Sequence, residues 1–124
     1  MDLFRQILSF DSTSGSEREL GQWLAEHLEA PFVETFEVGD GTLNVLLRWS
    51  ETPRVVYCSH MDTVPPYIPP TFTDDRVLGR GTCDAKGQFY AMYRACQRLA
   101  AAGRTDFGLL ILECSDPTMS PRER

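Results

Sequence analysis

The chain has 124 residues, of which 42% are hydrophobic, and this length suits one domain or at most two. Twelve basic and 18 acidic residues give a net charge of −6, and the cations are scattered singly. Because nucleic-acid binding depends on clustered cations, this composition argues against a nucleic-acid partner. No apolar run approaches the roughly 20 residues that span a bilayer, and the N-terminus lacks a secretion signal. We therefore expect a soluble, cytoplasmic protein with no membrane partner.

The first thirty residues predict two helices. Residues 2–9 form a short helix, and a polar turn follows at 11–15. Ser16 opens the second helix, because Glu19 three residues later completes a capping-box pattern, and Pro31 ends it. Four apolar residues of this helix fall on one face at helical spacing: Leu20, Trp23, Leu24 and Leu28.

Three β-rich runs follow at 32–38, 44–49 and 54–59. The last of them is continuously apolar in its middle, which is typical of a strand that is buried on both faces. A helix over 86–102 and an apolar run at 107–112 complete a strand–helix–strand unit. Because such a crossover joins parallel strands, the predicted fold class is α/β, a partial mixed or parallel sheet flanked by helices.

Two segments are expected to lack regular structure. Four prolines stiffen residues 63–75 and prevent both a helix and a central strand there. Residues 113–124 are polar, with two prolines and no periodicity, and we expect them to form a disordered tail. The chain therefore divides into a folded domain at 1–112 and this tail.

Polar side chains follow the apolar run at 54–59, at the sheet edge where α/β folds bind ligands. His60 and Asp62 are two residues apart, so in an extended chain they face the same side. Imidazole is a good zinc ligand, and the neighbouring carboxylate can hold its other ring nitrogen. Asp84 precedes the long helix and should reach the same edge, where its two oxygens can bridge two metal ions.

Other interpretations of these residues stay open. A His-x-Asp triplet is common by chance, and an Asp before a helix, such as Asp84, is usually an N-cap. A phosphate-binding loop is not indicated. Gly79-Arg80-Gly81 lacks the third glycine of the dinucleotide pattern, and the stretch from Gly81 to Lys86 misses the frame of a P-loop.

Four cysteines stand at positions 58, 83, 96 and 114, and none forms a C-x-x-C pair. Since we find no export signal, reduced thiols are expected, and the ordinary role of such residues is that of a small buried hydrophobe. Another role stays open for Cys83, because it stands next to Asp84.

Two longer strings are more specific than these spacings. The string S-H-M-D-T-V-P-P at 59–66 and the string G-R-G-T-C-D-A-K-G at 79–87 resemble the paired signature of a zinc amidohydrolase family. That family includes acetylornithine deacetylase, succinyl-diaminopimelate desuccinylase, aminoacylase and related carboxypeptidases. The segments 14–17 and 44–45 resemble it too. The similarity covers 1–112, as the N-terminal part of the catalytic domain, and is closest to the deacetylase and desuccinylase branch.

The resemblance assigns roles to three residues. It makes His60 a ligand of one zinc ion, Asp62 the catalytic carboxylate that orients this histidine, and Asp84 the carboxylate that bridges two zinc ions. Cobalt or manganese could replace the zinc. The resemblance also implies a cis peptide bond between Asp84 and Ala85. The implied reaction is metal-assisted hydrolysis of an N-acyl amino acid or of a small peptide-like amide.

The resemblance ends after the run at 107–112. Where the family has two adjacent glutamates, a general base and a metal ligand, this chain has Ser115 and Asp116, and Glu113 is out of register. A serine cannot act as a carboxylate base, so no general base is found, while Asp116 is a further metal-ligand candidate. The family's remaining ligands and its dimerisation domain have no counterpart. We therefore expect a chain that is inactive alone, and its oligomeric state is not predicted.

Two rival interpretations remain beside the truncated hydrolase. One is a non-catalytic metal-binding or interaction module on the same scaffold, and the other is an ordinary α/β domain with an accidental His-x-Asp triplet. A tail that packs on the sheet favours the module. A disordered tail and an exposed apolar sheet edge favour a truncated hydrolase, because missing strands leave unpaired backbone and bare core.

Overall fold

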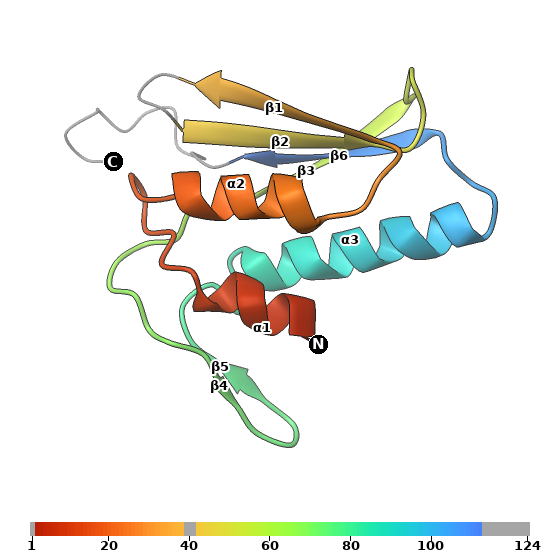
Figure 1. Cartoon of the computed structure of the whole chain (residues 1–124). Coiled ribbons are helices and arrows are strands. Elements are labelled where there is room, and N and C mark those ends of the chain that lie inside the picture. The colour runs from red at the N-terminus through yellow and green to blue at the C-terminus, as the bar shows by residue number, and fades with distance from the viewer. Residues whose placement is uncertain (1, 39–41, 113–124) are drawn as a thin grey trace.

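The computed structural model describes residues 2–38 and 42–112, which form three helices and six strands (Figure 1). None of the described helices is long and apolar enough to cross a membrane. The helices are α1 (Asp2–Ser9), α2 (Arg18–His27) and α3 (Lys86–Ala101). The strands are β1 (Phe32–Val38), β2 (Thr42–Arg48), β3 (Val55–His60), β4 (Thr71–Phe72), β5 (Val77–Leu78) and β6 (Phe107–Leu112).

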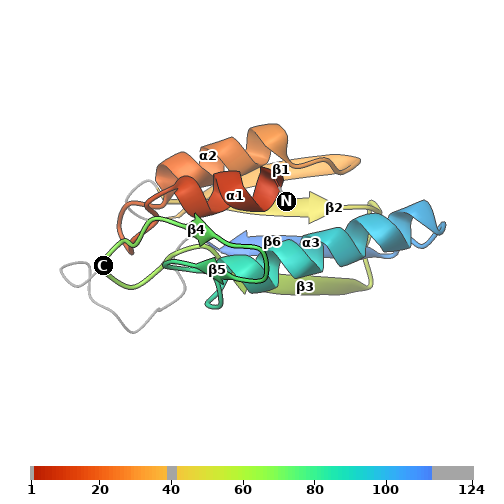
Figure 2. The ribbon, with the colours of Figure 1, turned by 90° about the horizontal axis from the view of Figure 1, so that it is seen from below.

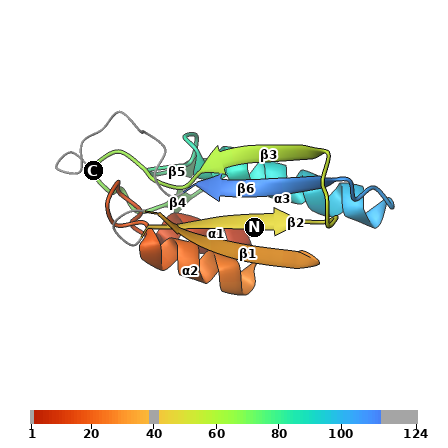
Figure 3. The ribbon, with the colours of Figure 1, turned by 90° about the horizontal axis from the view of Figure 1, so that it is seen from above.

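Four strands form one mixed sheet in the order β1-β2-β6-β3. The pairs β1–β2 and β2–β6 are antiparallel, while β3 and β6 run parallel and are joined through α3. All three helices lie on the same face of this sheet, as the views from the side and from above show (Figures 1 and 3). The predicted fold class and the predicted strand–helix–strand unit are therefore confirmed.

The core lies between the sheet and the helices. Along β2, Leu43, Val45 and Leu47 are buried and alternate with half-buried residues, so the period of two directs these three toward the helices. Burying one such side chain stabilises the fold by roughly 1.5–3 kcal/mol, which explains why the helices dock on this face. Their partners in the core include Ile7, Leu20, Leu24, Phe89, Leu109 and Ile111.

The prediction that the strand at 54–59 is buried on both faces is wrong. The exposed fractions of Val55, Val56 and Tyr57 are 49%, 47% and 41%. Within the described residues, β3 is an outer strand that pairs only with β6, and the three helices cover only one face of the sheet. A continuous apolar run indicates a strand that is suited to burial, but it does not show whether neighbouring elements cover that strand.

Two local predictions also need correction. The second helix begins at Arg18 rather than Ser16, and its N-cap residue Glu17 makes no side-chain capping bond. The backbone N–H of Ser16 instead closes a turn by donating to the carbonyl of Thr13 (2.7 Å). The proline-rich stretch, expected to be a loop, contributes Thr71–Phe72 to a small antiparallel hairpin with β5, which lies below α1 in Figure 1 and in front of the helices in the view from below (Figure 2).

The expectation of buried cysteines holds for Cys96 only. Cys58 and Cys83 are exposed, and all three have free thiols. Cys58 is exposed because it lies on β3, and the partial burial that remains there still raises the pKa of its thiol. Cys114 lies outside the described residues, as does the whole predicted tail at 113–124.

Candidate metal centre

The candidate site lies at the carboxyl ends of the parallel strands β3 and β6. His60 is the last residue of β3, and Asp84 lies in the turn that leads into α3. The peptide bond between Asp84 and Ala85 is cis, as the resemblance implies. The crossover from β3 through α3 to β6 thus brings two side chains that are 24 positions apart to one edge of the sheet.

The His60 ring lies between two carboxylates. Its Nδ1 is 3.1 Å from Oδ1 of Asp62, and its Nε2 is 3.1 Å from Oδ1 of Asp84. With the ring neutral and its proton on Nδ1 toward Asp62, the lone pair of Nε2 faces a carboxylate oxygen of Asp84. Two acceptors that face each other at this distance are arranged as the ligands of one cation would be.

The three side chains differ in their exposure to solvent. The Asp62 side chain is 9% exposed, His60 30% and Asp84 82%. The carboxylate that orients the ring is therefore held inside the protein, while the second candidate ligand faces outward. Any metal ion at this site would sit on the surface of the described part of the chain, open to ligands from elsewhere.

The loop between α1 and α2 surrounds Asp62. The backbone N–H of Thr63 donates to the carbonyl of Ser12 (2.9 Å), and the N–H of Ser14 donates to the carbonyl of Thr63 (3.0 Å). The hydroxyl of Ser12 donates to the carbonyl of Met61 (2.7 Å), and that of Ser14 donates to Oδ2 of Asp62 (2.9 Å). Both residues that flank Asp62, and its carboxylate, are thus fixed by one loop.

The start of α3 is also tightly built. Lys86, the only lysine of the chain, is fully buried, and its Nζ donates to the carbonyl of Phe10 (2.8 Å). Gly87 lies so close to the preceding turn that an added Cβ would be 2.0 Å from the carbonyl oxygen of Thr82. The backbone that carries Asp84 therefore has little freedom to move.

Asp11 begins the loop with a local turn. Its Oδ1 accepts from the hydroxyl of Thr13 (2.6 Å) and from the backbone N–H of Thr13 (3.1 Å). These two bonds, helped by the charge of Lys86, hold the pKa of the Asp11 carboxyl below its ordinary value. The sequence marks this segment only as a polar turn, so its contacts with residues 61–63, almost fifty positions away, escape sequence analysis.

The donor set suits zinc but is incomplete. Two tetrahedral ligands with bonds of about 2.0–2.1 Å would lie about 3.3 Å apart, close to the observed separation of Nε2 and Oδ1. Zinc takes four ligands, and the described residues contain no cluster of three or more His, Cys, Asp or Glu side chains able to hold a metal. The candidate Asp116, like Ser115 at the expected position of the general base, lies outside the described residues.

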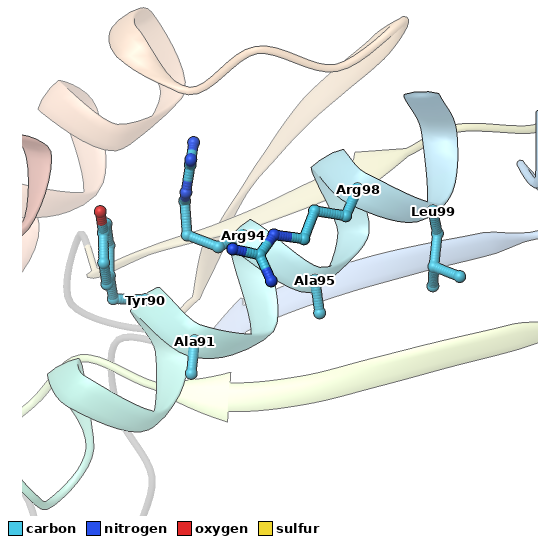
Figure 4. Close-up of a pocket in the computed structure, with 6 residues that line it drawn as sticks. All are labelled: Tyr90, Ala91, Arg94, Ala95, Arg98 and Leu99. Atoms are coloured by element: carbon cyan, nitrogen blue, oxygen red, sulfur yellow. The ribbon is translucent and has the colours of Figure 1, made fainter. Parts of the chain in front are cut away.

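A surface groove lies apart from these residues, along the outer side of α3 (Figure 4). In the close-up, the side chains of Tyr90 and Arg94 project to one side of the helix, those of Ala91, Ala95 and Leu99 project to the other, and that of Arg98 runs along the helix toward Arg94. None of these residues is His60, Asp62 or Asp84. The groove therefore adds no group to the candidate metal centre.

Comparison with known proteins finds related sequences and folds. Residues 56–113 match the model of Peptidase family M20/M25/M40. A protein of Thermococcus kodakarensis named as a LysW-lysine/LysW-ornithine hydrolase is 30% identical over 112 residues, which are 86% of this chain and 32% of that protein. A peptidase M20 domain-containing protein of Schizosaccharomyces pombe is 29% identical over 120 residues, with coverage of 90% and 30%.

The fold is also shared with solved structures. The M20 family metallo-carboxypeptidase Sso-CP2 of Sulfolobus solfataricus superposes with a TM-score of 0.71 at 21% identity, over 90% of this chain and 29% of that one. The chain therefore has the fold of part of an α/β domain of this kind. More particularly, residues 56–113 are similar to the M20 peptidase family, and the chain spans about a third of the length of the relatives that it matches.

Proposed function

We propose that this chain forms part of a metal-dependent hydrolase that cleaves an amide bond in a small substrate, either an N-acyl amino acid or a short peptide. Zinc is the proposed metal, with cobalt or manganese as substitutes. The matched relatives include proteins named as a hydrolase and as a carboxypeptidase, which supports this class of reaction. A cytoplasmic location, as the sequence predicts, is part of this proposal.

The convergence of His60 and Asp84 carries the proposal. Nε2 of His60 and Oδ1 of Asp84 lie 3.1 Å apart although the residues belong to different elements. Oδ1 of Asp62 lies 3.1 Å from Nδ1, so it would accept the proton of Nδ1 in the tautomer that a ligand histidine needs. An accidental His-x-Asp triplet would not explain why a second acidic side chain faces the remaining ring nitrogen.

Each residue has a defined task in this scheme. His60 would hold a metal ion through Nε2, Asp84 would bind it through one oxygen and a second ion through the other, and Asp62 would keep the ring oriented. When bound, zinc makes its water acidic near neutral pH and polarises a carbonyl. The general base and at least two further ligands are not among the described residues, so we propose that the chain has no hydrolytic activity alone.

Metal titration of the chain tests this proposal. Cobalt, followed by its visible absorbance, should bind weakly to the natural chain, and His60→Ala should abolish this binding. His27→Ala is the matched control, because His27 is the only other histidine and stacks on Trp23 at the end of α2. It should bind cobalt as the natural chain does. Equal uptake by the natural chain and His60→Ala would remove His60 from the site.

A non-catalytic metal-binding or interaction module is the second candidate. The presence of only two converging ligands within the described residues favours it. The exposed apolar strand β3 favours the hydrolase, because a self-contained module would cover such a strand. The coding sequence immediately downstream distinguishes the two. A continuation with adjacent glutamates supports the hydrolase, and its absence supports the module.

A further inference from the structure

The loop from Asp11 to Glu17 contacts both parts of the candidate metal centre, the segment after β3 that carries Asp62 and the start of α3 next to Asp84. At one end, Lys86 at the start of α3 donates to the carbonyl of Phe10, just before the loop (2.8 Å). At the other end, Glu17 is buried, and its Oε1 accepts from the N–H of Gly15 (2.8 Å). The loop is thus tied both to the element that carries Asp84 and to its own helix.

Between these ends, the loop forms bonds on both sides of Asp62. The backbone of Ser12 and Ser14 pairs with Thr63, and the hydroxyl of Ser12 holds the carbonyl of Met61. Ser12 and Thr63 are buried, so breaking these bonds would leave polar groups without water to replace their partners. The backbone around Asp62 is therefore held by bonds that do not involve the Asp62 side chain.

The two oxygens of the Asp62 carboxylate have separate partners. The hydroxyl of Ser14 donates to Oδ2 at 2.9 Å, and Nδ1 of His60 lies 3.1 Å from Oδ1. A carboxylate that accepts from a fixed hydroxyl on one oxygen cannot rotate freely, so its other oxygen keeps one direction toward the ring. Ser14 thus contacts Asp62, Asp62 contacts His60, and His60 contacts Asp84.

We propose that Ser14 is a positioning residue that sets the orientation and tautomer of His60 through Asp62. Its hydroxyl holds the carboxylate so that Oδ1 takes the Nδ1 proton and the lone pair of Nε2 faces Asp84. The effect of Ser14 on metal binding rests on the proposed function. Its effect on the His60 ring applies to the chain without metal.

The ring state can be measured directly by nitrogen-15 NMR, because the chain has only two histidines. With the ring neutral, the natural chain should show His60 with its proton on Nδ1. Ser14→Ala should shift the population toward the Nε2-protonated form, which free histidine prefers. Ser14→Cys keeps the side-chain volume and weakens the donor, so it should give an intermediate shift, while Ser14→Thr keeps a hydroxyl and should restore the natural state.

Ser16→Ala is the matched control. Ser16 lies in the same loop and is exposed, and its backbone rather than its side chain closes the local turn. This variant should leave the His60 spectrum unchanged. Circular dichroism of every variant shows whether the fold is retained, and Ser14→Cys and Ser14→Thr keep the test decisive if Ser14→Ala is unstable.

Cobalt affinity gives the second readout. Loss of a group that orients a ligand histidine typically weakens metal binding 10- to 100-fold, so Ser14→Ala should bind cobalt about tenfold more weakly than Ser16→Ala. If Ser14→Ala and Ser14→Cys both leave the tautomer and the affinity unchanged, the positioning role is overturned. If the tautomer shifts but no variant binds cobalt, the positioning role stands and the proposed metal site fails.

Discussion

The two ends of strand β3 are built in contrasting ways. At its carboxyl end, residues 61–63 just after His60 are hydrogen-bonded to the loop from Asp11 to Glu17. Along its length, the apolar side chains of Val55, Val56 and Tyr57 are exposed, and within the described residues no strand pairs with its outer edge. Natural proteins usually protect such an edge with charges, prolines or a covering element.

The comparison shows that contacts among the described residues hold the carboxyl end of β3, while the apolar side chains along the strand lack the covering neighbours that they suit. The orienting carboxylate, the ring and the outward-facing Asp84 are held by contacts within the chain. One exception is the hydroxyl of Thr63, which is buried without a hydrogen-bond partner among the described residues. Even so, the geometry around His60 does not depend on whatever lies beyond β3.

The largest expected effect contrasts the core with the outer strand. Leu109 on β6 is fully buried, and Leu109→Ala should cost about 2–5 kcal/mol of unfolding free energy because it removes packed methyl groups and leaves a cavity. Val56→Ala on β3 removes a half-exposed side chain and should cost less than about 1 kcal/mol. Urea unfolding measures both. Equal costs would show that β3 is covered in solution, which would contradict the exposure of its apolar side chains.

A second prediction tests the rigidity of the turn that carries Asp84. Gly87→Ala places a Cβ 2.0 Å from the carbonyl oxygen of Thr82, so the backbone must shift, at a cost of about 3 kcal/mol. Gly103→Ala is the control, because a Cβ there meets nothing within 4 Å and only the positive φ of 85° opposes it. It should cost about 1–2 kcal/mol. Thermal unfolding ranks the two variants, and the reverse order would contradict a close-packed turn.

Much of the fold could be predicted because it depends on local periodicity. The helical spacing of Leu20 and Leu24 predicts the buried face of α2, and both are buried, as is Leu28 directly after the helix. The crossover rule orders β3, α3 and β6 correctly. The environment of β3 could not be predicted in the same way, since a run of apolar residues has the same pattern whether or not neighbours cover it.

The candidate site also has one part that the sequence predicts and one that it does not. The proximity of His60 and Asp84 follows from the rule that carboxyl ends of parallel strands meet at one edge, and the structure places them 3.1 Å apart. Their role as metal ligands stays a prediction. The bond from Ser14 to Asp62 joins residues 48 positions apart through an irregular loop. Loop conformation depends on tertiary contacts, so no spacing in the sequence indicates this bond.

The smallest expected effect concerns the charge at the start of the loop. Bonds from Thr13 lower the pKa of Asp11 in the folded chain from the ordinary value of 3.8, so the folded state favours the ionised carboxylate. The resulting stabilisation is present above pH 3.8 and is lost as the pH falls through the lowered folded pKa. Because Asp11 is exposed, it should amount to less than about 0.5 kcal/mol.

Asp11→Asn and Thr13→Val separate the charge of the loop from its hydrogen bonds. Asp11→Asn keeps an acceptor oxygen and removes only the charge, so its unfolding free energy should fall slightly below that of the natural chain at neutral pH and match it in acid. Thr13→Val removes the hydroxyl bond, the largest cause of the shift, so NMR titration should find the pKa of Asp11 closer to 3.8. A pKa unmoved by Thr13→Val would mean that this hydroxyl does not hold the carboxylate in solution. The loop that contacts Asp62 would then lack the hydrogen bond at its first residue. The difference in order between this loop and the exposed edge of β3 would be smaller than the structure indicates.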